Sequence, residues 1–260
     1  MRKKTPVLVA AAGAALLVPA WYTVMARESP AEPIAEPPPA AAGPVAEAFR
    51  ERTVRERTAR EGAAREGTVR AADLLAATRS CTPVSNDMYS TDDGALADVP
   101  VCATRGAVFW KADMDVDCDG RPGKTCNDRT DPLFQPTTAF QQSDGRELDA
   151  ESLPYVVVPG ASHRWDHTEH GITGGTVAAV VHRDKVQYAV VGDTGPTDLI
   201  GEASYATARG LGINPDPGIG GAGADVTYIL FEGSKAEPIE SHGAAVARGE
   251  ELARRLVRGN

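Results

Sequence analysis

Short stretches of β-branched and aromatic residues recur after residue 105, separated by glycine, proline and aspartate. Compact apolar runs bounded by turn-forming residues are typical of β-strands. A mainly β fold with few helices favours a small β-barrel. The pattern predicts strands at 107–110, 155–158, 177–182, 186–191 and 226–231.

Two of these runs, 177–182 and 186–191, are close enough in sequence to form a hairpin that turns at residues 183–184. Longer segments with helical character follow at 198–209 and 243–258, and the first ends at Gly210 and Gly212. The second segment has acidic residues before a closing group of arginines, which suits the helix dipole. Both segments are therefore predicted to be helices.

The first quarter of the chain has a different composition. Arg2, Lys3 and Lys4 precede an apolar run at 7–25, which predicts an export signal over residues 1–26. A run of about 20 apolar residues is also long enough to stay as a membrane anchor, so cleavage and retention both remain open. Because the basic residues precede the run, the rest of the chain is expected outside the cell, secreted or anchored facing outward.

Residues 27–72 resemble a spacer more than a folded domain. A proline-rich stretch at 30–44 favours extended polyproline II, and an Arg-Glu repeat with a five-residue period fills 50–70. This period supports helical ion pairs but forms no continuous apolar stripe. We predict a linker or stalk over 27–72 and a globular domain over 73–260.

The predicted domain is strongly acidic. The whole chain has 27 basic and 36 acidic residues, and the first 72 residues contain 11 and 8 of them, which leaves 16 and 28, or a net charge of −12, for 73–260. Such a charge repels nucleic acid and anionic lipid and attracts polycations, although solubility alone also favours an acidic surface. We expect no nucleic-acid partner, a monomer, and membrane contact only through a retained N-terminal anchor.

The four cysteines, Cys81, Cys102, Cys118 and Cys126, all lie early in this domain. In an exported chain they predict two disulfide bonds, for which the sequence leaves three connectivities open. A zinc site is the competing interpretation, but the Cys-x-x-Cys spacing typical of such sites is absent from the sequence.

Two acids follow the apolar strand predicted at 186–191. Asp193 lies in a Gly-Pro turn after that strand, and Glu202 comes nine residues later at the start of the predicted helix. Rigid elements can hold two such acids across a cleft, as two-carboxylate hydrolysis of a sugar-sugar bond requires. The alternative is that Asp193 caps a turn and Glu202 occupies a helical first turn, where both residue types are common.

Four more acids alternate along one segment: Asp113, Asp115, Asp117 and Asp119. The spacing imitates a calcium-binding EF-hand loop, but Cys126 occupies the position of the essential glutamate. In an extended strand these acids share one face and form an anionic strip that can bind amines. A structural cation and a solvated turn are the alternatives.

Aromatic residues supply possible platforms for sugar rings, although each can equally belong to the core. The histidines at 163–170 are interpreted as a polar loop near the cleft, and we expect no resident metal or cofactor. The candidate platforms are Trp110, Trp165, Tyr188 and Tyr205.

Four blocks in this order resemble fungal-type chitosanases of glycoside hydrolase family 75: FWKADMDVDCDG (109–120), LPYVVVP (153–159), VQYAVVGDTGP (186–196) and IGEAS (200–204). The resemblance covers roughly residues 80–255. It implies endo-hydrolysis of the β-1,4 bonds of chitosan, a cationic polysaccharide, with inversion at the anomeric carbon. It also places the family's two essential carboxylates at Asp193 and Glu202. Residues 192–196 further resemble the strand and turn of double-psi β-barrels.

An inverting mechanism needs one protonated and one ionised carboxyl group. We assign Glu202 as the general acid and Asp193 as the general base, and the sequence leaves the reverse assignment open. Two other functions also stay open. One is a polysaccharide-binding barrel without turnover, and the other is a glycosidase of the same fold acting on another glycan, whose uncharged units would gain nothing from the acidic surface.

Overall fold

The structure is a computed structural model that describes residues 66–259. The predicted export signal and most of the predicted stalk lie outside the described residues. Within 66–259, no helix combines the length and the apolar character that crossing a bilayer requires. The described chain makes contacts from its first residue, because Glu66 accepts a hydrogen bond from the backbone N–H of Tyr188 at 2.5 Å.

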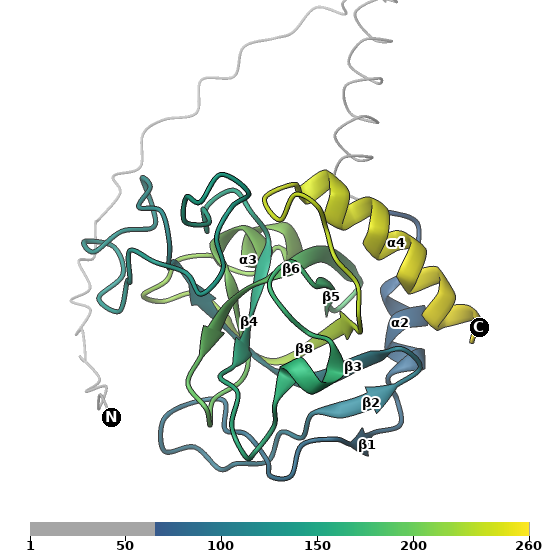
Figure 1. The fold of residues 1–260 in the computed structure, drawn as a ribbon. Helices are drawn as coiled ribbons and strands as arrows, with labels where there is room; N and C mark the ends of the chain where they lie inside the picture. Colours follow the sequence, from purple (N-terminus) through teal and green to yellow (C-terminus); the bar gives the residue numbers. More distant parts are fainter. Residues whose placement is uncertain (1–65, 260) are drawn as a thin grey trace, which may run out of the picture. The chain divides into compact units, whose positions relative to one another are not determined.

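Eight strands form one sheet that closes on itself (Figure 1). Six of them make a barrel in the order β3-β7-β4-β6-β5-β8, which closes through pairing of β8 with β3, and β1 and β2 extend it beyond β3. The mainly β fold and the small barrel are therefore confirmed, while the double-psi connection stays a prediction. The strands are β1 Thr82–Pro83, β2 Cys102–Thr104, β3 Ala107–Asp117, β4 Tyr155–Pro159, β5 Val177–His182, β6 Lys185–Gly195, β7 Glu202–Ser204 and β8 Ala222–Phe231.

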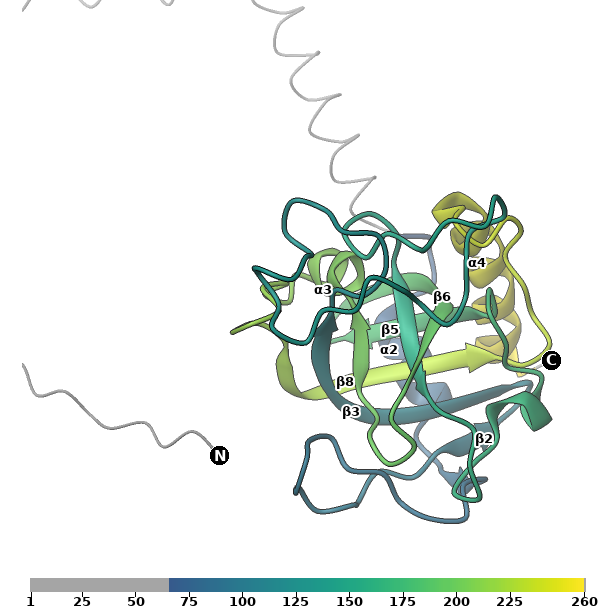
Figure 2. The same ribbon diagram turned by 60° about the vertical axis from the view of Figure 1, so that its left-hand side comes forward.

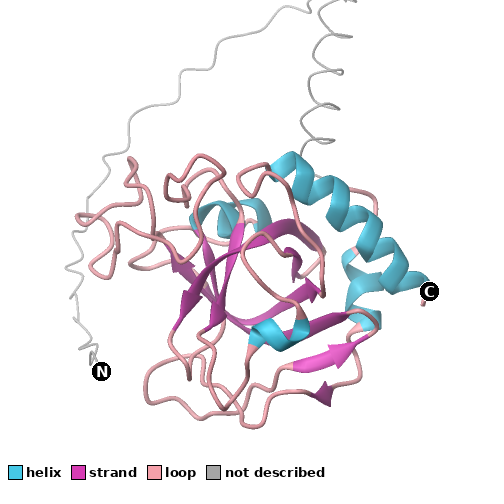
Figure 3. Cartoon of the chain, in the orientation of Figure 1, coloured by secondary structure: helices cyan, strands magenta, loops and turns pink. Residues whose placement is uncertain are grey.

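Helices are few in the described chain, and long loops join many of the strands (Figure 3). The helices are α2 Ala71–Ala77, α3 Tyr205–Leu211 and α4 His242–Arg258, together with the short 3-10 helix η1 His167–His170. The predicted helix at 243–258 is confirmed as α4. Its first turn is capped by the Ser241 hydroxyl, which accepts from the N–H of Ala244 at 3.2 Å, and it ends at Gly259 in the left-handed conformation.

Alternation along the strands divides the core into two layers. Side chains such as Val108, Val156 and Val180 fill the barrel interior. Their neighbours, such as Phe109 and Val157, face outward and belong to a second cluster that includes residues of α2 and α4. In Figure 1, α2 and α4 lie together at one side of the barrel, where they cover part of this outer face.

The predicted hairpin is confirmed, because β5 and β6 pair antiparallel from Val177 with Val190 to His182 with Lys185. The predicted helix at 198–209 began too early. Glu202 and the two residues after it form β7, because they pair with β3 and β4, and α3 starts only at residue 205. Pairing with distant strands here overrides the local helical preference.

The two predicted disulfides are present and join Cys81 to Cys102 and Cys118 to Cys126. The first ties the chain before β1 to β2. The second closes a short ring just after β3, at the start of the long segment 118–154, which we call the β3–β4 loop. This loop contains no helix or named strand and lies over one end of the barrel in Figure 2.

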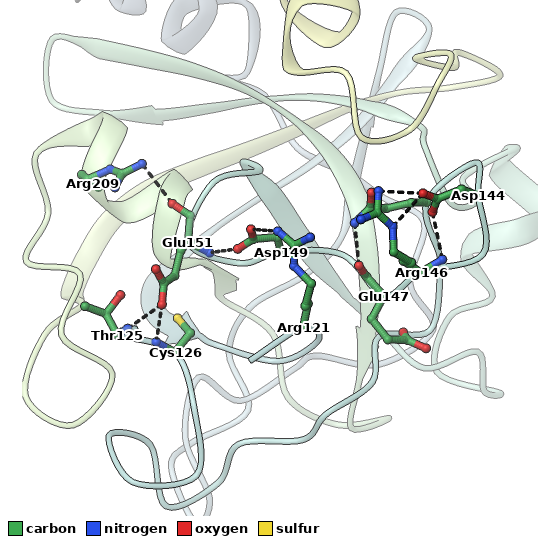
Figure 4. Close-up of polar contacts among 10 residues, drawn as sticks. Arg121, Thr125, Cys126, Asp144, Arg146, Glu147, Asp149, Glu151 and Arg209 are labelled. Carbon is green, nitrogen blue, oxygen red and sulfur yellow. Dashed lines mark hydrogen bonds and ion pairs between the residues drawn. The ribbon is translucent and has the colours of Figure 1, made fainter. Parts of the chain in front are cut away.

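Polar contacts hold the β3–β4 loop in place (Figure 4). Arg121 and Asp149 form an ion pair at 2.5 Å that joins the two ends of the loop. The Glu151 carboxylate accepts hydrogen bonds from the backbone N–H groups of residues 125 and 126, and its carbonyl accepts from Arg209 on α3 at 3.0 Å. The loop is therefore fixed against the barrel although it lacks regular structure.

Candidate active site

Asp193 and Glu202 lie on the two strands that flank β4. Val157 on β4 pairs with Asp193 of β6 on one side and with Glu202 of β7 on the other. Residues paired directly across a sheet point to the same face, so both carboxylates project from the outer face of the barrel, as Val157 does. Because β4 lies between the two strands, the Cα atoms of Asp193 and Glu202 are two inter-strand spacings apart, or about 10 Å.

A β-bulge gives Asp193 this direction. The pairing of β4 with β6 shifts between Val156 and Val157, which face Val191 and Asp193 respectively, so Gly192 is the extra residue. Val191 points into the barrel, and regular alternation would send Asp193 inward as well. The inserted residue turns Asp193 to the outer face, where Glu202 lies.

Gly192 also allows a close approach between the strand and its neighbours. A Cβ atom at this position would lie 2.6 Å from Cβ of Tyr155 and 2.9 Å from Cδ1 of Leu148. Both of these side chains are fully buried, so neither can move away easily. The bulge that aims Asp193 therefore depends on glycine.

The acidic segment predicted from the sequence joins the same face. Asp115 on β3 pairs with Glu202, so one row of paired residues runs Asp115, Glu202, Val157, Asp193 across four strands. Asp113 and Asp117 lie two residues to either side of Asp115 on that face. Of the strand acids, Asp115 is exposed, whereas Asp113 and Asp117 are buried.

Glu202 has the environment of an acid that keeps its proton. Burial, the larger cause, and the negative charge of surrounding aspartates together raise the pKa of Glu202 to about 8, and no hydrogen bond among the described residues offsets this effect. Four aspartates contribute to this shift. In decreasing order of effect, these are Asp115, Asp119, Asp193 and Asp131.

Asp193 has a different environment although it too is buried. Burial raises its pKa, but its Oδ1 accepts hydrogen bonds from the backbone N–H groups of Ala139 at 2.8 Å and Thr194 at 2.7 Å, which lower the pKa. Ala139 belongs to the β3–β4 loop, so the loop itself supplies one of these donors. Such donors favour the ionised carboxylate.

Asp117 lies close to both acids. Burial raises its pKa well above the usual value, and the charges of Glu202, Asp119 and Asp193 add to the shift. Its Oδ1 accepts from the N–H of Asp119 at 2.6 Å, and the Tyr155 hydroxyl donates to the Asp119 carbonyl at 3.0 Å. Because Asp117 is only 5% exposed, it has little surface for contact with a substrate.

Three of the four predicted aromatic platforms lie inside the core. Trp110 points into the barrel interior, because even-numbered residues of β3 face inward. Its ring packs edge to face with the ring of Trp165, with centroids 6.4 Å apart. Tyr188 lies beneath α4 and donates to Glu250 at 3.0 Å. These three side chains are at most 3% exposed, so the prediction that they stack on sugar rings is wrong. Tyr205, at the start of α3, is half-buried.

The histidines of the loop at 163–170 have separate partners. His167 bonds the Ile172 carbonyl at 2.8 Å, and His170 pairs with Glu232 at 3.0 Å. The sequence did not point to three further groups around the row of acids: Asp92 beside Asp113 and Asp115, Asp131, whose charge acts on Glu202, and the N–H of Ala139. They come from loops whose positions depend on tertiary contacts, and no motif in the sequence identifies them.

Comparison with known proteins identifies a family that this chain matches. Residues 114–254, more than half of the chain, match the family described as "Fungal chitosanase of glycosyl hydrolase group 75". The match includes both acids and the whole β3–β4 loop.

Curated relatives include proteins named endo-chitosanase. Endo-chitosanase B of Aspergillus oryzae is 34% identical over 152 residues, which cover 52% of this chain and 63% of the relative. An endo-chitosanase of the same species is 36% identical over 145 residues, covering 50% and 58%. One from Aspergillus fumigatus is 32% identical over 146 residues, covering 51% and 61%.

The chain thus spans about three fifths of the length of these relatives. The family match includes the strands that carry the paired acids, and the resemblance seen in the sequence is confirmed. We conclude that this chain belongs to the fungal chitosanase family, group 75 of the glycosyl hydrolases.

Proposed function

We propose that this protein is an endo-acting chitosanase that hydrolyses β-1,4 bonds with inversion of the anomeric carbon. The observation that carries the proposal is the pairing of Asp193 and Glu202 with the same residue of β4, from opposite sides. A Cα separation of about 10 Å leaves room for the carboxyl spacing of roughly 6.5–9.5 Å that inverting enzymes use.

In this mechanism Glu202 is the general acid and protonates the oxygen of the leaving sugar. Its raised pKa keeps the proton available at neutral pH. Asp193 is the general base and removes a proton from the water that attacks the anomeric carbon from the opposite face. The two N–H donors on Asp193 favour its ionised form, which supports this assignment over the reverse.

The proposed substrate is chitosan, because matched relatives are named endo-chitosanases and because residues 73–260 have a net charge of −12. The acids of the strip, Asp113, Asp115, Asp117 and Asp119, are proposed to attract the amines of the polymer. Uncharged glycans such as chitin would gain nothing from this charge, and a binding barrel without turnover would need no pair of acids.

We further propose an extracellular, monomeric enzyme. Two disulfides are present, and such bonds persist in oxidising surroundings. Retention of the N-terminal segment as an anchor would leave the same domain facing outward.

The test compares wild type with Asp193→Asn and Glu202→Gln on chitosan, chitin and cellulose in parallel, with released reducing ends as the readout. Each variant is expected to lose 10²–10⁴-fold in kcat, as removal of a general acid or base does. Asp184→Asn is the matched control, because Asp184 is exposed in the β5–β6 turn. Full activity in either site variant would contradict the mechanism, and faster cleavage of chitin than chitosan would contradict the substrate.

A further inference from the structure

Three carboxylates converge beside the row of paired acids. One oxygen each of Asp92, Asp113 and Asp115 lies within 4.8 Å of the other two. Asp113 and Asp115 project from β3, whereas Asp92 lies in the connection between β1 and β2. We call these three residues the Asp92 cluster.

Backbone hydrogen bonds place the Asp92 cluster next to Glu202. The N–H of Asp115 donates to the carbonyl of Gly201 at 2.8 Å. Ser90, two residues before Asp92, accepts from the N–H of Ile200 at 3.0 Å. Both sides of the cluster are therefore tied to the residues that directly precede Glu202.

Asp113 gives the cluster a buried acceptor. Its side chain is only 8% exposed, and its Oδ1 is buried without a hydrogen-bond partner among the described residues. Gly201 makes room for this oxygen, because a Cβ there would lie 2.1 Å from it. Buried carboxylates are normally paired, so the Asp113 side chain favours a cation held by the three carboxylates.

The charges nearby offer no such partner. Ion pairs with arginine or lysine within 66–259 involve other acids, such as Asp73, Asp149 and Glu250. Burial, followed by the charges of Asp115 and Asp92, raises the pKa of Asp113 to about 7, so the ionised cluster is costly until a cation arrives.

The spacing fits an ammonium group. An ammonium of the –NH₃⁺ type has three N–H donors, one for each carboxylate of the cluster. With charge-assisted N···O distances of about 2.8 Å and tetrahedral directions, the three acceptor oxygens lie about 4.6 Å apart. The observed limit of 4.8 Å is compatible with this arrangement.

We propose that Asp92, Asp113 and Asp115 form a socket for the ammonium group of one glucosamine unit bound next to Glu202. This inference rests on the proposed chitosanase function and adds Asp92 as a residue that determines specificity. An N-acetylated unit at this position has no charge and leaves the buried carboxylate of Asp113 unpaired. The enzyme therefore requires a deacetylated unit at this one subsite.

The test uses Asp92→Asn, because Asp92 is exposed and its replacement leaves the fold intact. Asp93→Asn is the matched control, since it removes the same charge from the adjacent exposed position. Binding of a glucosamine hexamer is measured by calorimetry, and cleavage is measured on that hexamer and on hexamers with one N-acetylated unit.

Asp92→Asn is expected to weaken hexamer binding about 10-fold and to raise KM with little change in kcat, because a hydrogen bond to a charged group is lost. It is also expected to cleave bonds beside an acetylated unit that wild type leaves intact. Asp93→Asn keeps the behaviour of wild type. Equal binding and equal cleavage patterns in the two variants would overturn the socket.

A divalent metal ion is the competing occupant, and thermal unfolding distinguishes it. The hexamer is expected to raise the wild-type Tm, whereas EDTA and added Ca²⁺ leave the Tm unchanged. If EDTA lowers the Tm and Ca²⁺ restores it in wild type but not in Asp92→Asn, the site binds metal and the proposal is wrong. If wild type binds the hexamer without cleaving it, the proposed function is wrong. The socket is then still tested by calorimetry, which compares hexamer binding by wild type and by Asp92→Asn.

Discussion

Replacement of Gly192 by alanine tests how the bulge positions Asp193. The added Cβ would lie 2.6 and 2.7 Å from Cβ and Cγ of Tyr155, and 2.9 Å from Leu148. Because both neighbours are fully buried, the strand must shift rather than the side chains. Overpacking of this kind costs about 1–3 kcal/mol in the free energy of unfolding. For a domain of this size that lowers Tm by about 2–12 °C.

The effect on catalysis should be larger than the effect on folding. A shift of about 1 Å in a catalytic group can cost 10²-fold in rate, so we expect kcat to fall about 100-fold at a temperature where the variant is fully folded. Tm is measured by circular dichroism, and kcat by reducing ends released from chitosan.

Gly223→Ala is the control for this experiment, because Gly223 also lies on a strand and a Cβ there meets nothing within 4 Å. It should keep the Tm and kcat of wild type. If Gly192→Ala behaves like this control, the bulge does not aim Asp193 and the geometric argument is wrong.

Three other predictions follow from the electrostatics and the disulfides. The folded state raises the pKa of Glu202 from 4.5 to about 8, so the protonated acid stabilises the fold at low pH, and this stability is lost as the pH rises through about 8. Glu202→Gln has no such proton to lose, so its Tm should fall less between pH 5 and pH 9 than the Tm of wild type. An equal fall in both proteins would contradict the raised pKa. Asp115→Asn removes the neighbouring charge that raises the pKa of Glu202 most, so the alkaline limb of kcat on soluble glucosamine oligomers should move to lower pH, and an unmoved limb argues against that coupling. Loss of the Cys118 to Cys126 disulfide should reduce the free energy of unfolding in urea by about 2–4 kcal/mol, whereas an unchanged midpoint would mean that the ring is not stabilising.

The sequence was sufficient for the features that depend on local pattern. Alternating apolar runs and turn residues predicted the β5–β6 hairpin, and charge at both ends predicted α4. The parity of Asp113, Asp115 and Asp117 also predicted that these three share one face, because β3 stays extended through residue 117, whereas Asp119 lies beyond the end of the strand.

Features that depend on contacts between distant residues could not be predicted in this way. The three residues of β7 are a strand only because β3 and β4 flank them, so Glu202 was expected in a helix. The direction of Trp110 depends on which face of β3 the closed barrel encloses, which no local pattern reveals. Asp92 approaches Asp113 through tertiary contacts alone.

The configuration of the first product tests the central claim most directly. The proposed inverting mechanism needs carboxyl groups roughly 6.5–9.5 Å apart, which acids on the two strands flanking β4, with Cα atoms about 10 Å apart, can provide. Retaining enzymes hold their carboxyl groups about 5 Å apart. Proton NMR during the first minutes of hydrolysis of a glucosamine hexamer is expected to show the α-anomer first, before mutarotation. Initial formation of the β-anomer would contradict direct attack by water and the proposed roles of Asp193 and Glu202.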